Sequence, residues 1–264
     1  EIAQCLVGSE MCIRDRKNTL STMTEQTDIM MARSISLSED ITKELNQCLT
    51  ANGKTFSNLN DNPQLIMDLE AALYPSLKSA LDVKYCSGVF VVLDATVNTK
   101  TEYADTSRMG IYLRLSDLKA VNTSRQHVVF FRGNADIARA EQVQLHNRWN
   151  LEFDTSALSG YEQIMQFDGN RLVESCLWTD RLELSDTWED VQLLYVPVLD
   201  STGKVRGLCG MEMSNLYFRL SYPMVEGSCG NIVTVLAPVD KKGNIYLDTV
   251  SYTHLRAHET LSDL

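Results

Sequence analysis

Hydrophobic residues recur along residues 18–50 at intervals close to multiples of 3.5, while Ser, Thr, Asp, Glu and Gln occupy the other positions. This spacing predicts one long helix with a narrow apolar stripe. The stripe consists of Leu20, Met23, Met30, Leu37, Ile41, Leu45, Cys48 and Leu49. Asn52-Gly53 then supplies a C-terminal stop signal. We expect this helix to lie along the flank of a domain, to act as a signalling stalk that continues from a membrane helix, or to do both.

The following segments predict a second helix and then short strands. Asn62-Pro63 begins a helix over 63–83, whose apolar face recurs at helical spacing. The β-branched and apolar runs that follow predict strands at 88–95, 110–114 and 127–132. Helical spacing returns over 135–149 and predicts a third helix.

A hairpin is predicted near the C-terminal part of the chain. Residues 191–198 and 204–213 are its strands, and Asp200-Ser201-Thr202-Gly203 is its turn. A short helix over 215–220 follows, and residues 232–247 repeat the strand–turn–strand pattern. The predicted fold class is α+β, with a long N-terminal helix flanking an antiparallel sheet and the start of a second, similar unit.

The two ends of the chain are related to each other as translated DNA strands. Codons for Glu10–Asp15 can be chosen so that their reverse complement encodes Val250–Leu255, and codons for Cys5–Ser9 so that theirs encodes Arg256–Thr260. We expect residues 1–16 and 250–264 to be translated sequencing adapter and leave them out of the fold prediction. The metal-like pair His254 and His258 falls in this excluded part.

The hairpin sequence VPVLDSTGKVRGLCGME, residues 196–212, together with Trp178-Thr179-Asp180 and the long first helix, resembles the double Cache (dCache) sensors of bacteria. The resemblance implies an extracytoplasmic module of two stacked PAS-like subdomains. It implies a stalk helix over 17–60, a membrane-distal ligand-binding subdomain over 61–222 and the start of a truncated proximal subdomain over 223–249. The sequence of residues 132–154 and 186–200 is similar to that of sensors fused to membrane-anchored AraC-like helix-turn-helix regulators.

Composition and charge narrow the classes of function. Hydrophobic residues make up 44% and charged residues 22%, which is ordinary for a globular chain. The net charge of −11 argues against nucleic-acid contact by this chain. No apolar run is long enough to span a bilayer, so membrane anchoring is expected from flanking segments outside this sequence. A homodimer through the N-terminal helix is expected from its narrow stripe.

A PAS-like pocket would lie between the sheet and the inserted region 130–190, which combines aromatic with charged residues. In such a pocket Arg would bind a carboxylate or phosphate, Trp and Tyr would stack on the ligand, and Asp would pair with an ammonium. Packing, surface ion pairs and turn capping are the alternative roles. The candidate ligand-binding residues are Tyr112, Arg114, Arg132, Arg148, Trp149, Asp154, Tyr161, Trp178 and Asp180.

Catalysis, metal binding and cofactor binding have little support in the sequence. It contains neither a Gly-x-Ser-x-Gly elbow nor a Cys-x-x-Cys pair. Gly227-Ser228-Cys229-Gly230 more simply marks a turn. Two alternatives to an extracytoplasmic small-molecule sensor stay open. One is a cytoplasmic PAS- or GAF-like sensory module. The other is an enzyme that would use His146, Glu152, Asp154 and Asp180.

The cysteines outside the expected adapter are Cys48, Cys86, Cys176, Cys209 and Cys229. Cys86 and Cys209 lie in apolar strand surroundings and are expected to pack as small hydrophobic residues. The sequence does not define a disulfide.

Overall fold

A computed structural model describes residues 2–81, 86–116, 127–168, 172–184, 189–221, 226–227, 230–231, 235–236 and 251–252. The chain divides into two compact units. One unit is residues 30–214, and the other combines residues 1–29 with 215–264. The predicted boundary at residue 222 falls outside the described residues, and the adapter origin of the two ends stays a prediction.

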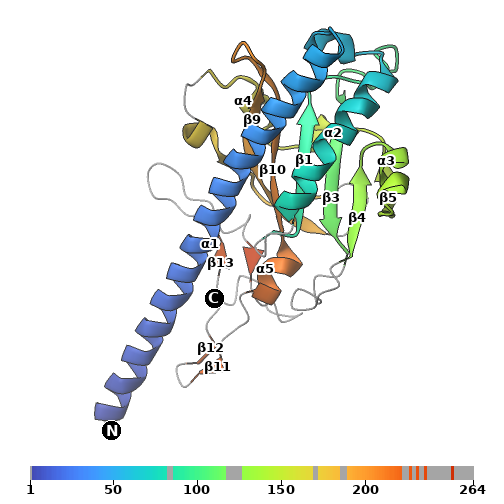
Figure 1. The fold of residues 1–264 in the computed structure, drawn as a ribbon. Coiled ribbons are helices and arrows are strands. Elements are labelled where there is room, and N and C mark those ends of the chain that lie inside the picture. The colour runs from blue at the N-terminus through green and yellow to red at the C-terminus, as the bar shows by residue number, and fades with distance from the viewer. Residues whose placement is uncertain are drawn as a thin grey trace. The chain divides into compact units, whose positions relative to one another are not determined.

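Helix α1 runs without a break from Ile2 to Ala51 (Figure 1), which confirms the predicted helix and extends it toward the N-terminus. It ends where Gly53 adopts φ +61° and Lys54 donates its backbone N–H to Leu49, as the Asn-Gly stop signal predicts. No described helix carries an apolar stretch that could cross a membrane.

The apolar stripe of α1 from Met30 onward is buried within unit 30–214. Met30, Leu37, Ile41, Leu45 and Leu49 are at most 6% exposed. Polar contacts add to this packing, because Ser38 donates its hydroxyl to the carbonyl of Pro197 at 2.6 Å. This part of the helix therefore lies on the flank of a domain, as one of the two interpretations predicted.

Within the described residues, eight strands of unit 30–214 form one sheet in the order β5-β4-β3-β1-β10-β9-β7, with β8 also paired to β9. All pairs are antiparallel except β4 and β5, which are parallel. The bounds are β1 Gly88–Leu93, β3 Gly110–Leu115, β4 Val128–Arg132, β5 Gln144–Asn150, β7 Leu177–Trp178, β8 Leu182–Glu183, β9 Asp190–Leu199 and β10 Val205–Ser214. The α+β fold class and the predicted hairpin of β9 and β10 are confirmed.

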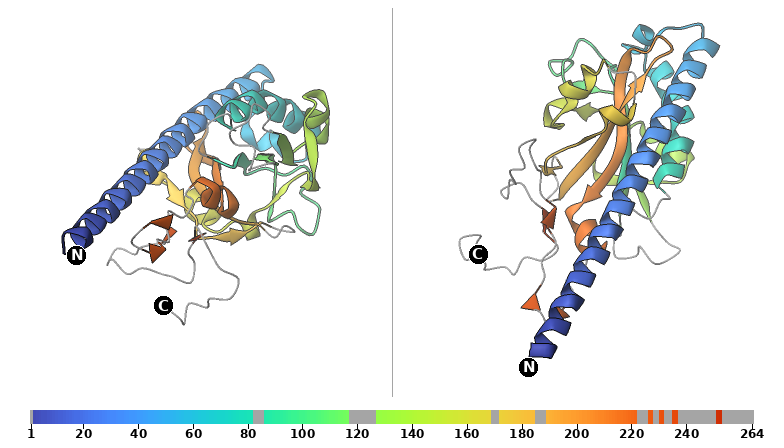
Figure 2. Two further views of the ribbon diagram at one scale, coloured as in Figure 1. Left: turned by 90° about the horizontal axis from the view of Figure 1, so that it is seen from below. Right: turned by 90° about the vertical axis from the view of Figure 1, so that its left-hand side faces the viewer.

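Short elements complete this unit. They are η1 Phe56–Leu59, α2 Pro63–Leu81, α3 Ala135–Ala140, η3 Thr155–Ala157, α4 Tyr161–Met165 and η4 Leu172–Ser175, with the small pair β2 Ser107–Arg108 and β6 Phe153–Asp154. Helix α2 and residues 30–51 of α1 cover one face of the sheet (Figures 1 and 2). The described residues between β5 and β9, which include α4 and are called the inserted segment, cover the other face. Covering on both faces explains why β1 is buried along its whole length and β9 along all but its two end residues.

The predicted helix over 135–149 is wrong beyond Ala140. Asn134 caps the start of α3 by accepting the N–H of Asp136, but the backbone of Gln142 takes φ +56° and ends the helix. Residues 144–150 then pair with β4 as β5. Pairing with an open sheet edge has overridden the helical spacing of this segment.

The other unit contains α5 Asn215–Ser221, which confirms the predicted short helix, and the strands β11 Glu226–Gly227, β12 Gly230–Asn231, β13 Val235–Leu236 and β14 Ser251–Tyr252. β11 pairs with β12, and β13 with β14. The predicted strand at 245–247 lies outside the described residues.

Candidate functional site

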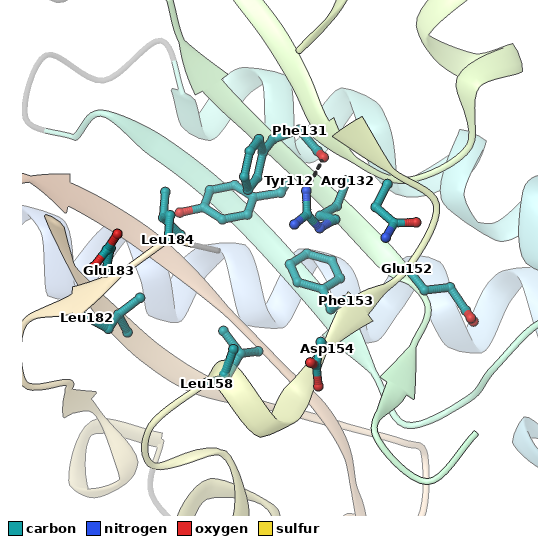
Figure 3. Close-up of a pocket in the computed structure, with 12 residues that line it drawn as sticks. Tyr112, Phe131, Arg132, Glu152, Phe153, Asp154, Leu158, Leu182, Glu183 and Leu184 are labelled. Atoms are coloured by element: carbon teal, nitrogen blue, oxygen red, sulfur yellow. Dashed lines mark hydrogen bonds between the residues drawn. The ribbon is translucent and has the colours of Figure 1, made fainter. Parts of the chain in front are cut away.

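A pocket of about 200 Å³ lies between the sheet and the inserted segment (Figure 3). Its lining has an aromatic wall, an aliphatic side and polar side chains. The aromatic residues are Tyr112, Phe131 and Phe153; the aliphatic ones are Ala157, Leu158, Leu182 and Leu184; the polar ones are Arg132, Asn150, Glu152, Asp154 and Glu183. Arg132 and Glu152 lie at one side of the view and Leu158, Leu182 and Leu184 at the other.

The aromatic wall is built from three different strands. The ring of Tyr112 on β3 lies 5.4 Å from that of Phe131 on β4, edge to face, and 6.0 Å from the nearly parallel ring of Phe153 on β6. These rings belong to a buried apolar cluster that also contains Tyr161, Leu193 and Tyr195. The packing fixes the wall in one arrangement.

Behind this wall, Tyr112 donates its hydroxyl hydrogen bond to the buried carboxylate of Glu212 on β10. Arg114 approaches the same carboxylate, with Nε 2.7 Å from Oε2 and Nη2 3.0 Å from Oε1. Ser87 donates its hydroxyl to Oε1 at 2.6 Å. Burial raises the pKa of Glu212, but Arg114 and these hydrogen bonds outweigh burial and hold that pKa below its ordinary value. The Glu212 side chain is therefore charged at neutral pH.

The space for this carboxylate depends on Gly88 of β1. A Cβ atom at that position would lie 2.8 Å from Oε2 of Glu212. Arg114 also pairs with Glu189, whose side chain is 48% exposed, so this arginine joins a buried carboxylate to a partly exposed one.

Arg132 brings a positive charge into the pocket lining. Its guanidinium lies 4.1 Å from the ring centre of Phe131. Nη1 donates to the carbonyl of Phe131 at 2.8 Å and to that of Arg148 at 3.0 Å. These contacts fix the guanidinium beside the aromatic wall.

Two of the lining carboxylates hold neighbouring loops. Glu152 accepts the N–H of Val97 at 2.8 Å and the hydroxyls of Thr96 and Ser107. Asp154 caps η3 by accepting the N–H of Ser156 at 3.0 Å. The polar side of the pocket is therefore held in place by loop contacts as well as by the sheet.

The structure brings part of the predicted site together. Tyr112, Arg132 and Asp154 line the pocket. Arg114 lies behind it, and Tyr161 belongs to the adjoining apolar cluster.

The remaining candidates do not line the pocket. Arg148 is exposed on β5, where its carbonyl accepts from Arg132, and the indole of Trp149 donates to Gly133. Trp178 on β7 pairs with Leu194 of β9, and Asp180 is an exposed residue that follows. Their roles in binding stay predictions.

Sequence reasoning missed Phe131, Phe153 and Glu212. Glu212 carried a signal, because a charged residue inside the apolar run of β10 must have a buried partner. The two phenylalanines carried none, because apolar residues in a strand look alike whichever face of the sheet they occupy.

The four candidates for catalysis do not form a hydrogen-bonded group within the described residues. The ring of His146 packs edge-on against Phe131 at 5.0 Å, and its Nδ1 accepts the N–H of Arg148 at 3.1 Å. Glu152 and Asp154 hold loops, as described above. In the same part of the chain, no three His, Cys, Asp or Glu side chains gather as metal ligands. His254, His258 and Cys229 lie outside the described residues.

Cys86 and Cys209 are buried to 1% and 0% exposure, which confirms that they pack as small hydrophobic residues. Burial raises the pKa of Cys86 to about 12. In the part of the chain that the structure describes, Cys48, Cys86, Cys176 and Cys209 take part in no disulfide.

No family model and no curated protein matches the chain. Solved structures are similar to it, among them the following two. The periplasmic sensory domain of the Campylobacter jejuni chemoreceptor Tlp1 is 10% identical with a TM-score of 0.47, over 84% of this chain and 66% of that one. Methyl-accepting chemotaxis protein X is 12% identical with a TM-score of 0.48, over 94% of this chain and 78% of that one. This chain thus spans just under two thirds of the Tlp1 domain.

Proposed function

We propose that this chain is the small-molecule-binding part of a sensory receptor and that the ligand occupies the pocket between the sheet and the inserted segment. The observation that carries this proposal is the construction of the pocket wall. Tyr112 faces the pocket with its ring and bonds through its hydroxyl to the buried Glu212. A concave, partly apolar space with a few fixed polar groups is the usual form of a small-ligand site.

The wall also offers a route from the pocket to the end of the sheet. Glu212 lies on β10, which ends at Ser214, where unit 30–214 also ends. A ligand that contacts Tyr112 would therefore act on Glu212, which lies close in the chain to the end of this unit. Such a ligand would shift the populations of two arrangements of the unit if it bound one of them more tightly.

The resemblance to double Cache sensors supports an extracytoplasmic location and a membrane anchor supplied by flanking segments. On this proposal the 223–249 region begins a second PAS-like subdomain, and an output domain follows. An AraC-like helix-turn-helix region is a candidate for that output.

A homodimer through α1 is part of the same proposal, but the surface it would use is restricted. Apart from the half-buried Cys48, the stripe residues from Met30 to Leu49 are already buried within their own unit. Pairing of two α1 helices would therefore use the part before Met30 or the polar, exposed face.

A thermal-shift screen of a small-molecule library against the full chain tests the proposal. A saturating ligand at about 100 times its Kd adds about 2.7 kcal/mol to the folding free energy, which a shift in Tm detects. Ala157→Trp would fill the pocket from its wall, and Ala140→Trp, on the exposed end of α3, is the matched control.

We expect ligands that stabilise the wild type and the A140W variant but not A157W. Ligands that stabilise all three proteins equally would place binding elsewhere. A library that stabilises none of them would contradict a small-molecule sensor.

A further inference from the structure

Helix α2 carries a buried carboxyl group on the helix-covered side of the sheet, away from the pocket. Glu70 is 1% exposed, and its Oε2 accepts the backbone N–H of Asn134 at 3.0 Å. Asn134 lies in the turn between β4 and α3 and caps that helix. Glu70 therefore ties α2 to the turn that directly follows the pocket residue Arg132.

The same turn, which contains Gly133 and Asn134, also contacts Trp149 of β5. The N–H of Asn134 and the C=O of Gly133 belong to the same peptide group, and that C=O accepts the indole Nε1–H of Trp149 at 2.9 Å. Gly133 also donates its own N–H to the carbonyl of Asn150, which lines the pocket. One peptide group thus joins the carboxyl of Glu70 to the indole of Trp149.

We propose that Glu70, the Gly133–Asn134 peptide and Trp149 form a proton-responsive hydrogen-bond chain, through which the charge on Glu70 sets the environment of Trp149 beside the pocket. A carboxylate is a stronger acceptor than a neutral carboxyl group. Loss of the Glu70 proton strengthens the bond from Asn134, polarises the peptide and makes the Gly133 carbonyl a stronger acceptor for the indole.

The surroundings of Glu70 place this change in an accessible range of pH. Burial, together with the negative charge of Glu152, raises the pKa of Glu70 to about 8, against the lowering effect of the Asn134 and Gly110 backbone. The side chain is therefore mostly neutral at pH 7 and mostly charged at pH 9.

Other charged groups on the elements packed against α2 are engaged elsewhere. β1 and η1 contain no titratable side chain. On β3, Tyr112 and Arg114 bond to Glu212 on the pocket side. Near α3, Asp136 pairs with Arg139, and Glu141 pairs with Lys78 of α2 itself. Glu152 is thus the charge outside these pairs that acts on Glu70.

The test follows the fluorescence of Trp149 in the full chain, without any ligand. The sequence has three tryptophans, so Trp178→Phe with Trp188→Phe leaves Trp149 as the reporter. Titration from pH 6.5 to 9.5 should show one transition of its emission, with a midpoint at about 8. The pKa of His146 is lowered by burial and nearby arginines, so its own step falls below this range.

Glu70→Gln in the same background should abolish the transition, and Glu141→Gln should leave it in place. A protein without a transition between pH 6.5 and 9.5, or a transition that persists in E70Q, overturns the proposal. Should E70Q fail to fold, carbon-13 NMR of labelled glutamate in the wild type decides the same question. The chemical shift of one glutamate carboxyl carbon must change with a midpoint near pH 8. The nitrogen-15 chemical shift of the Asn134 amide must change with the same midpoint. Since no ligand takes part, neither result bears on the proposed function.

Discussion

Arg114 and Glu212 form a buried ion pair behind the pocket wall, with Nε 2.7 Å from Oε2 and side chains that are 4% and 0% exposed. The pair lies across β3 and β10, which are separated by β1 in the sheet. Because Tyr112 and Ser87 also bond to this carboxylate, the pair fixes a pocket residue as well as the end of the sheet.

Breaking this pair from one side should be costly. Arg114→Met leaves the buried carboxyl group of Glu212 without its cation, so this group must either carry an unpaired charge or take up a proton. We expect a loss of about 3–5 kcal/mol in the free energy of unfolding. Urea denaturation of the single variant and of the double variant R114M/E212L measures the effect. The double variant should recover much of the loss, because both charges are then gone. A loss below about 1 kcal/mol in R114M would contradict this account.

Glu70 should make stability depend on pH in a defined direction. Its pKa in the folded protein, about 8, is above the ordinary value of 4.5. The folded state therefore holds a proton that the unfolded chain releases, and stability is lost as the pH rises from about 4.5 to 8. The contribution is about 1.4 kcal/mol per unit of pKa difference.

Glu70→Gln removes this term. Urea titrations at several pH values should show the variant gaining on the wild type between pH 5 and 8, and no further above 8. Glu141→Gln changes a surface residue that directly follows α3. The free energy of unfolding of this variant should depend on pH as that of the wild type does. A constant difference between E70Q and the wild type across this range would refute the assignment.

Asp200 should stabilise the β9–β10 hairpin down to low pH. Its partial burial raises the pKa, but hydrogen bonds from Thr202 and Arg206 lower the pKa to about 2. Because the folded pKa is below the ordinary 3.8, its contribution is present above pH 4 and lost as the pH falls toward 2. Asp200→Asn should cost about 1–2 kcal/mol at pH 7. The cost, measured by urea denaturation, should shrink at pH 2.5; an unchanged cost at that pH would rule out an ionic origin.

The burial of the α1 stripe predicts a large effect at its centre. Ile41 is fully buried, so Ile41→Ala should destabilise unit 30–214 by about 2–5 kcal/mol. Since the stripe packs on its own chain, the loss caused by Ile41→Ala should be the same at every protein concentration. A midpoint that rises with concentration in the wild type, and loses that dependence in I41A, would instead place the stripe in a subunit contact.

Much of the fold was predictable because it depends on local signals. Helix α1, helix α2 and the β9–β10 hairpin each combine a clear apolar period with a start, stop or turn signal, such as Asn62-Pro63 or Asn52-Gly53. The prediction for residues 144–150 was wrong because their apolar spacing also suits a helix. Only the free edge of β4 decides that they form a strand.

The candidate site divides in the same way. The sequence by itself determined that aromatic and charged residues concentrate in the inserted region, and it identified Tyr112, Arg132 and Asp154 among the lining residues. It could not choose between them and Trp178 or Asp180, because composition does not say which side chains converge.

Only the tertiary structure decided which distant residues meet. Glu212 reaches Arg114 because β1 holds β3 and β10 at a fixed spacing, with Gly88 leaving room for the carboxylate. Glu70 and Trp149 bond to the same Gly133–Asn134 peptide group because α2 packs against the turn that follows β4. Local sequence specifies helices and turns through short-range sterics and hydrogen bonds, whereas these contacts depend on the register of strands far apart in the chain.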